Sequence, residues 1–159
     1  MRELSEAEIK SKAEAYCSAV ERCPSEVEEK ICKWGASEEV TAQIMAHLHR
    51  ERYLDAARFC RFYVRDKYRF NQWGRMKIAQ MLRMKGLSDG DIQAGLEEID
   101  TEEYDGILKK LLKQKMKSIK AANDYERSMK LIRFAMGRGF TLEEIRRYVN
   151  QLDPDEDFD

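Results

Sequence analysis

An internal repeat is the feature of this sequence that most limits how the chain can fold. GLSDGDI at 86–92 and GFTLEEI at 139–145 share a glycine, an apolar residue, a hydroxyl residue, an acid and an isoleucine at the same positions. GASEEV at 35–40 is the same element, shortened by one residue. The copies start 51 and 53 residues apart, a spacing typical of tandem copies of one supersecondary unit.

The repeated unit is predicted to be helical. No segment alternates apolar and polar residues as a strand would, and the chain has only two prolines and 37% charged residues. Glycines at 35, 86 and 139 fit the ends of helices. Four segments resemble the capping box that starts a helix: Ser5-x-x-Glu8, Ser25-x-x-Glu28, Ser88-x-x-Asp91 and Thr141-x-x-Glu144.

These signals predict an all-α protein of three tandem three-helix units, at 5–53, 54–100 and 101–150, which form an elongated, curved array. The acidic segment 151–159 is predicted to be a disordered tail. Three helices with a sharp turn before the last one also describe helix-turn-helix DNA-binding domains.

Charge is distributed in blocks along the chain, although the net charge is only −1. Residues 58–85 hold nine Lys/Arg and one acid, residues 86–108 hold eight acids and no Lys/Arg, and residues 109–138 hold ten Lys/Arg and two acids. For an anionic partner such as nucleic acid, this local field matters more than the total charge.

The basic blocks contain the candidate binding residues. At about 100° per residue, four arginines from 58 to 69 lie opposite an apolar face that includes Phe59, Tyr63 and Phe70. The candidates for contact with DNA or a partner protein are Arg58, Arg61, Arg65, Arg69, Arg75, Lys77, Arg83, Lys85, Lys109, Lys113, Lys117, Lys120, Arg127, Lys130 and Arg133.

Each of these features also has a simpler interpretation. The arginines can form a solvated helix face, although acids for i,i+4 pairing are nearly absent around them. Phe62 can pack against a neighbouring helix, or stack on a base or anchor in a partner pocket. Trp34 and Trp73 precede glycines, where we expect them to fill gaps between helices.

Several classes of protein are not indicated by this sequence. It contains no P-loop, G-x-S-x-G or H-E-x-x-H motif, so we expect no enzyme activity and no cofactor. The four cysteines form no C-x-x-C pair, and His47 and His49 diverge on a helix, so we expect reduced thiols and no metal site. No apolar run approaches the ~20 residues of a membrane span, and we expect a cytoplasmic protein.

The order and spacing of these motifs resemble one known family. The run GASEEVTAQIMAHLHRERYLDAARFCRFYVRDK, with Leu54, Asp55, Arg58 and Phe59 opening a long helix, is similar to the hallmark of the RecX regulators of bacterial RecA recombinase. WGRMKIAQMLRMKGLSDGDIQAGL resembles that family's next unit. The similarity covers about residues 10–149.

The resemblance implies a non-catalytic monomer that binds in the groove of the RecA filament on single-stranded DNA. It implies inhibition of ATP hydrolysis, filament extension and strand exchange, and so regulation of homologous recombination and DNA repair in the SOS response. Direct contact with single-stranded DNA is expected to be weak and electrostatic. The first alternative is a sequence-independent DNA-binding protein that acts without RecA, and the second is a helical scaffold that binds an acidic protein.

Overall fold

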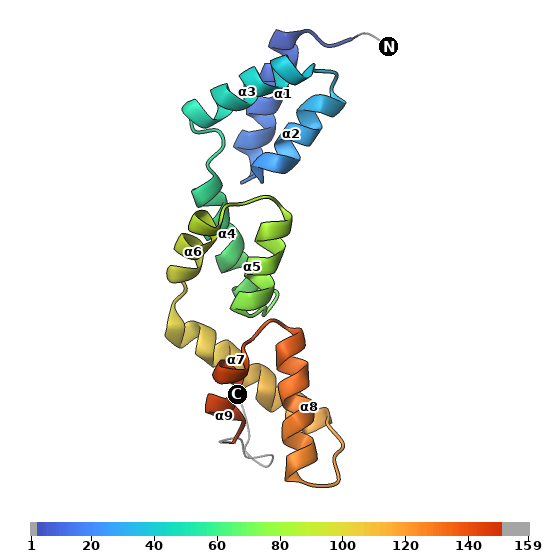
Figure 1. The fold of residues 1–159 in the computed structure, drawn as a ribbon, viewed down its shortest axis with the longest axis vertical. Coiled ribbons are helices and arrows are strands. Elements are labelled where there is room, and N and C mark those ends of the chain that lie inside the picture. The colour runs from blue at the N-terminus through green and yellow to red at the C-terminus, as the bar shows by residue number, and fades with distance from the viewer. Residues whose placement is uncertain (1–2, 151–159) are drawn as a thin grey trace. The chain divides into compact units, whose positions relative to one another are not determined.

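The computed structural model describes residues 3–150, and within that range the chain is all-α, as predicted. The tail predicted at 151–159 lies outside the described residues. The helices of the described range (Figure 1) are α1 (Glu6–Ala19), α2 (Pro24–Lys33), α3 (Glu38–Arg50), α4 (Ala56–Arg69), α5 (Arg75–Met84), α6 (Asp89–Glu97), α7 (Thr101–Ser118), α8 (Asp124–Gly137) and α9 (Leu142–Val149).

Three of the four predicted helix starts are confirmed. Ser5 and Thr141 form complete capping boxes with Glu8 and Glu144. The Ser88 hydroxyl accepts a hydrogen bond from the Asp91 amide at 3.2 Å. Each of these side chains satisfies a backbone N–H that has no partner within its helix.

The predicted helix start at Ser25 is wrong. The N-cap is Cys23, two residues before Ser25, and helix α2 begins at Pro24, whose missing N–H and fixed φ suit the first turn of a helix. Ser25 is then free for a distant contact, and its hydroxyl donates a 2.6 Å hydrogen bond to the carbonyl of Lys85.

The described residues divide into two compact units. Unit 1 comprises the described residues up to Phe62 together with Leu82–Gly95, and unit 2 comprises Tyr63–Met81 and the described residues from Leu96 onward. Helices α4 and α5 therefore each contribute residues to both units. The boundaries proposed for the three repeats remain a prediction.

In unit 1, one hydrophobic core cluster is formed chiefly by α1, α2 and α3, which lie side by side in Figure 1. Each fully buried aliphatic side chain there contributes about 1.5–3 kcal/mol to stability. Gly95 of α6 comes so close to α4 that a Cβ atom would lie 3.2 Å from the carbonyl carbon and oxygen of Cys60. The buried residues of this cluster are Ile9, Ala13, Cys17, Val27, Ile31, Ile44, Leu48 and Leu54.

In each unit, a glycine turn packs on the start of an earlier helix. In unit 1, the Lys85–Gly86 turn meets the start of α2 through Ser25 and through a 2.6 Å contact between Lys85 Nζ and Glu26 Oε1. In unit 2, the amide of Gly74 donates to the carbonyl of Arg138 at 2.8 Å. The repeated turn thus has an equivalent packing role in both units.

The unit 2 contact is made between two backbones. The amide of Met76 donates to the carbonyl of Gly139 at 3.0 Å. A Cβ atom on Gly74 would lie 2.3 Å from the carbonyl of Gly139, and one on Gly139 would lie 2.3 Å from the Cβ of Lys77. Gly139 also has a φ of +99°, which only glycine adopts readily. Both positions therefore require glycine.

The prediction that Phe70 faces the core is wrong. Helix α4 ends at Arg69, so the helical periodicity that placed Phe70 with Phe59 and Tyr63 does not extend to it. Its side chain is 79% exposed, whereas Phe59 and Tyr63 are buried as predicted. Gln72 then adopts a φ of +58°, which turns the chain towards α5.

Candidate nucleic-acid and protein interface

The arginines of α4 differ in their contacts. Arg58 pairs with Glu21 at 2.5 Å in unit 1, and Arg69 pairs with Glu103 at 2.5 Å in unit 2. The acids that the local sequence lacks thus come from distant segments. Arg65 is exposed and makes no ion pair with the described residues, whereas Arg61 is half-buried.

The first turn of α4 is fixed by Asp55. Its carboxylate accepts a 3.0 Å hydrogen bond from the amide of Arg58. That hydrogen bond, together with the nearby arginines, lowers the pKa of Asp55. The negative charge of the carboxylate also interacts favourably with the positive N-terminal end of the helix dipole. Asp55 therefore stabilises the start of the helix that carries the arginines.

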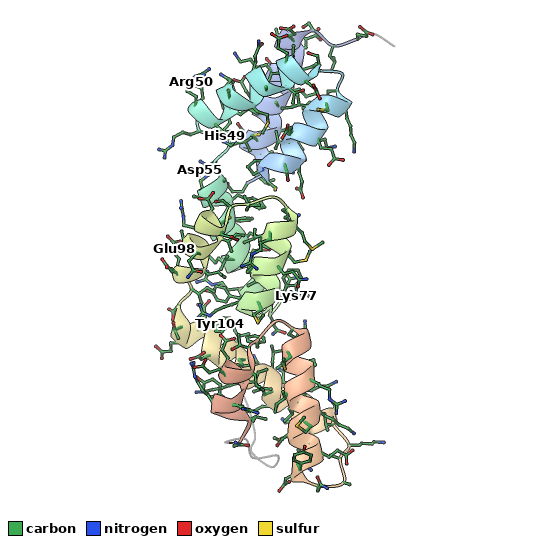
Figure 2. All side chains as sticks on the ribbon, viewed as in Figure 1. His49, Arg50, Asp55, Lys77, Glu98 and Tyr104 are labelled. Carbon is green, nitrogen blue, oxygen red and sulfur yellow. The ribbon has the colours of Figure 1, made fainter. Side chains whose placement is uncertain are left out.

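Arg75 belongs to a polar network inside unit 2. Its amide donates to the hydroxyl of Tyr104 at 3.0 Å, and its Nε donates to Glu144 at 3.3 Å. The Tyr104 hydroxyl donates to the other oxygen of Glu144 at 3.2 Å, and burial raises the pKa of Tyr104. Figure 2 labels Tyr104 on α7. The Arg75 guanidinium thus compensates a buried carboxylate, and its predicted role at an interface stays a prediction.

Arg83 and Lys85 are paired within unit 1. Arg83 contacts Asp89 at 3.2 Å between two well-exposed side chains, a pair that contributes at most about 1 kcal/mol. Lys85 contacts Glu26 at 2.6 Å and is more buried. Arg83 can therefore exchange its partner at little cost, whereas Lys85 also helps to hold the turn before α6.

Unit 2 carries most of the exposed candidate cations. On α7, Lys109 lies 4.6 Å from the ring centroid of Tyr148 on α9. Lys117, Lys120 and Arg133 are exposed, while Lys113 is half-buried.

On α8, the candidate cations are partly engaged by acids of the same helix. Arg127 contacts Asp124 at 3.0 Å and Lys130 contacts Glu126 at 3.2 Å. At these spacings, i,i+3 and i,i+4, an ion pair stabilises a helix by only a few tenths of a kcal/mol. The two acids therefore compete only weakly with an anionic partner for these cations.

Near Lys77 lie two further cations, Lys67 and Arg138, which are not among the predicted candidates. Lys67 and Lys77 both approach the Trp73 ring, with Nζ 5.2 and 4.5 Å from its centroid. Arg138 donates to the carbonyl of Asn71 at 3.3 Å in the same loop. Figure 2 labels Lys77 on α5. The i,i+4 spacing of Trp73 and Lys77 could have suggested this contact, but the loop that brings in Lys67 could not be predicted.

No group of His, Cys, Asp or Glu in residues 3–150 has a geometry that could hold a metal ion. Within the same residues no helix is both long and apolar enough to cross a bilayer. Cys17, Cys23 and Cys60 are buried thiols, and burial raises the pKa of Cys60 to about 11.

Two solved structures with a similar fold are both RecX proteins, a class of regulatory protein. A crystal structure of RecX from Lactobacillus salivarius superposes with a TM-score of 0.82 over 93% of this chain and 96% of that one, at 19% identity. A crystal structure described as regulatory protein RecX gives a TM-score of 0.78, at 23% identity, over 91% of this chain and 74% of that one.

Sequence comparisons agree with the fold. Residues 55–96 match the model of the second three-helix domain of RecX, and residues 102–149 match that of the third. Regulatory protein RecX of Pectobacterium atrosepticum is 30% identical over 96% of this chain and 92% of its own length. The chain therefore belongs to the RecX family.

Relatives differ in length. The RecX protein of Oceanobacillus iheyensis is 28% identical over 87% of this chain, which spans only 51% of that protein. The chain likewise spans 59% of the RecX protein of Clostridium tetani.

Proposed function

We propose that this protein is a non-catalytic regulator that binds the RecA filament on single-stranded DNA and slows its ATP hydrolysis, extension and strand exchange. It acts in the cytoplasm, as a monomer, on homologous recombination and DNA repair. The observation that carries the proposal is membership of the RecX family over nearly the whole chain.

The charge of the described surface supports this proposal. A filament presents both acidic protein surface and DNA phosphate, and arginine and lysine bind either one. We assign the contact chiefly to cations of unit 2 that are at least partly exposed. The exposed ones are Arg65, Lys109, Lys117, Lys120 and Arg133, and the half-buried Lys77, Arg127 and Lys130 are added to them.

The other candidates combine contact with a structural role. Arg58, Arg69, Arg83 and Lys85 are already in ion pairs, and Arg75 is held by Glu144. An exposed ion pair contributes only about 0–1 kcal/mol, so Arg69 and Arg83 can exchange a carboxylate for a partner's anion.

The proposal is tested by the rate of ATP hydrolysis by RecA on single-stranded DNA. We expect added protein to lower this rate at amounts below one molecule per RecA, because a bound regulator blocks extension beyond its own site. An unchanged rate, with DNA still bound by the protein, would favour the alternative of a DNA-binding protein acting without RecA.

A further inference from the structure

Lys67, Lys77 and Arg138 surround the loop between α4 and α5 in unit 2, and this loop carries charge that the described residues do not balance. The two lysine Nζ atoms approach one indole ring, that of Trp73. Because both are near the same centroid, they lie within about one Debye length (~10 Å) and repel each other. Arg138 is brought to the same loop by its hydrogen bond to Asn71.

Acidic residues do little to neutralise this group. The only ion pair that it makes with residues 3–150 joins Lys67 to Asp66, at 3.8 Å. Lys77 and Arg138 have no acidic partner within the same residues. Cation–π contacts hold the ammonium groups of Lys67 and Lys77 in place but leave their charge available, because an aromatic ring accepts no proton and carries no net charge.

The loop also presents an aromatic ring to solvent. Phe70 is 79% exposed, the highest value among the exposed large apolar side chains of the described residues. Its backbone is fixed, because its amide donates to the carbonyl of Asp66 at 2.9 Å. The amides of Asn71 and Trp73 both donate to the carbonyl of Lys67, at 3.2 and 3.1 Å. A fixed backbone at this position lowers the entropy that the loop loses when the ring binds.

The amides at the start of α5 are not part of this group. The amide of Arg75 already donates to Tyr104, and that of Met76 donates to Gly139. An anion at this loop would therefore be bound by side chains and not by these two amides. The flexible stems of Lys67 and Lys77 let both ammonium groups turn from the indole towards one phosphate.

We propose that Lys67, Lys77 and Arg138 bind a backbone phosphate of single-stranded nucleic acid, and that Phe70 stacks on an adjacent base. Phosphate binding and stacking occur together in single-strand sites, whereas a duplex hides the faces of its bases. This inference deepens the proposed function, because it places the DNA contact, but it does not depend on contact with RecA.

Trp73 provides the signal that tests this proposal. The chain has two tryptophans, so Trp34→Phe leaves Trp73 as the only one. We expect oligothymidylate of ten nucleotides to produce a saturable change in its fluorescence, as the ammonium groups leave the indole. Inorganic tripolyphosphate is the second probe, because it offers phosphate oxygens without a base.

Three variants and a matched control separate the contributions of charge and ring. Lys67→Gln with Lys77→Gln is expected to weaken binding of both probes at least tenfold, and the Lys67→Arg, Lys77→Arg pair is expected to retain it. Phe70→Ala should weaken only oligothymidylate binding, by about tenfold. Lys12→Gln with Lys33→Gln removes the same charge from unit 1 and should change neither affinity.

Three results would overturn the proposal. The first is that neither probe changes the fluorescence of Trp73. The second is that the Lys12/Lys33 control loses as much affinity as the Lys67/Lys77 glutamine variant. The third is that Phe70→Ala loses affinity for both probes to the same extent. If filaments of RecA still bind the protein when Trp73 gives no signal, this inference fails and the proposed function stands.

Discussion

Replacing Gly139 with Ala is expected to destabilise unit 2 by about 3 kcal/mol. The new methyl group would lie 2.3 Å from the Cβ of Lys77 and 2.7 Å from its amide nitrogen. Such overpacking costs about 1–3 kcal/mol, and the positive φ of Gly139 adds about 1–2 kcal/mol for a residue with a side chain. Urea unfolding followed by the fluorescence of Trp73, in a Trp34→Phe background, measures the change.

Gly35→Ala is the matched control for this experiment. Gly35 has a similar φ, +105°, but apart from its own chain neighbours no atom lies within 4 Å of the position of its added methyl group. Only the backbone strain remains, so we expect a loss of about 1 kcal/mol in unit 1. Its neighbour Trp34 reports on that unit in a Trp73→Phe background. Equal costs at the two glycines would contradict the close approach of the two turns in unit 2.

Reversing three exposed charges in unit 2 is expected to weaken filament binding at least tenfold. The variant combines Arg65→Glu, Lys120→Glu and Arg133→Glu, whose side chains make no ion pair within residues 3–150. If each contacts a phosphate, the slope of log affinity against log salt falls by about 2, at ~0.7 per contact on a single strand. Titration of immobilised RecA filaments at salt concentrations from 50 to 200 mM, a ~fourfold range, measures both the affinity and its slope against salt.

A second triple variant controls for net charge. Lys10→Glu, Lys33→Glu and Arg50→Glu make the same change of charge on exposed residues of unit 1, outside the candidate list. We expect the affinity of this variant to stay within about twofold of the wild type. In both triple variants, the free energy of unfolding should differ from the wild type by no more than about 0.5 kcal/mol per substitution. If both triple variants lose affinity equally, the contact depends on total charge and not on unit 2.

Local features of the fold could be predicted from the sequence because they depend on neighbouring residues. The caps at Ser5 and Thr141, and the positive φ of Gly139, follow from signals within a few residues of one another. The errors at Ser25 and Phe70 have the same origin. Each lies where a helix begins or ends, and such boundaries are decided within a single turn.

The site was less predictable because its contacts join distant segments. The sequence shows arginines without nearby acids, yet Glu21 and Glu103 reach Arg58 and Arg69 from 37 and 34 residues away. In the same way, Tyr104 and Glu144 are separated by 40 residues. Charge counts along the chain therefore identify basic segments, but only the tertiary structure separates available cations from those already paired.

Co-sedimentation tests the central claim, that the partner is the RecA filament, most directly. The protein is spun with RecA filaments on single-stranded DNA, with the DNA alone, and with RecA alone. We predict that it pellets with the filaments at a salt concentration at which it no longer associates with the DNA alone. Equal association with bare DNA and with filaments, or no association with filaments at all, would contradict this account.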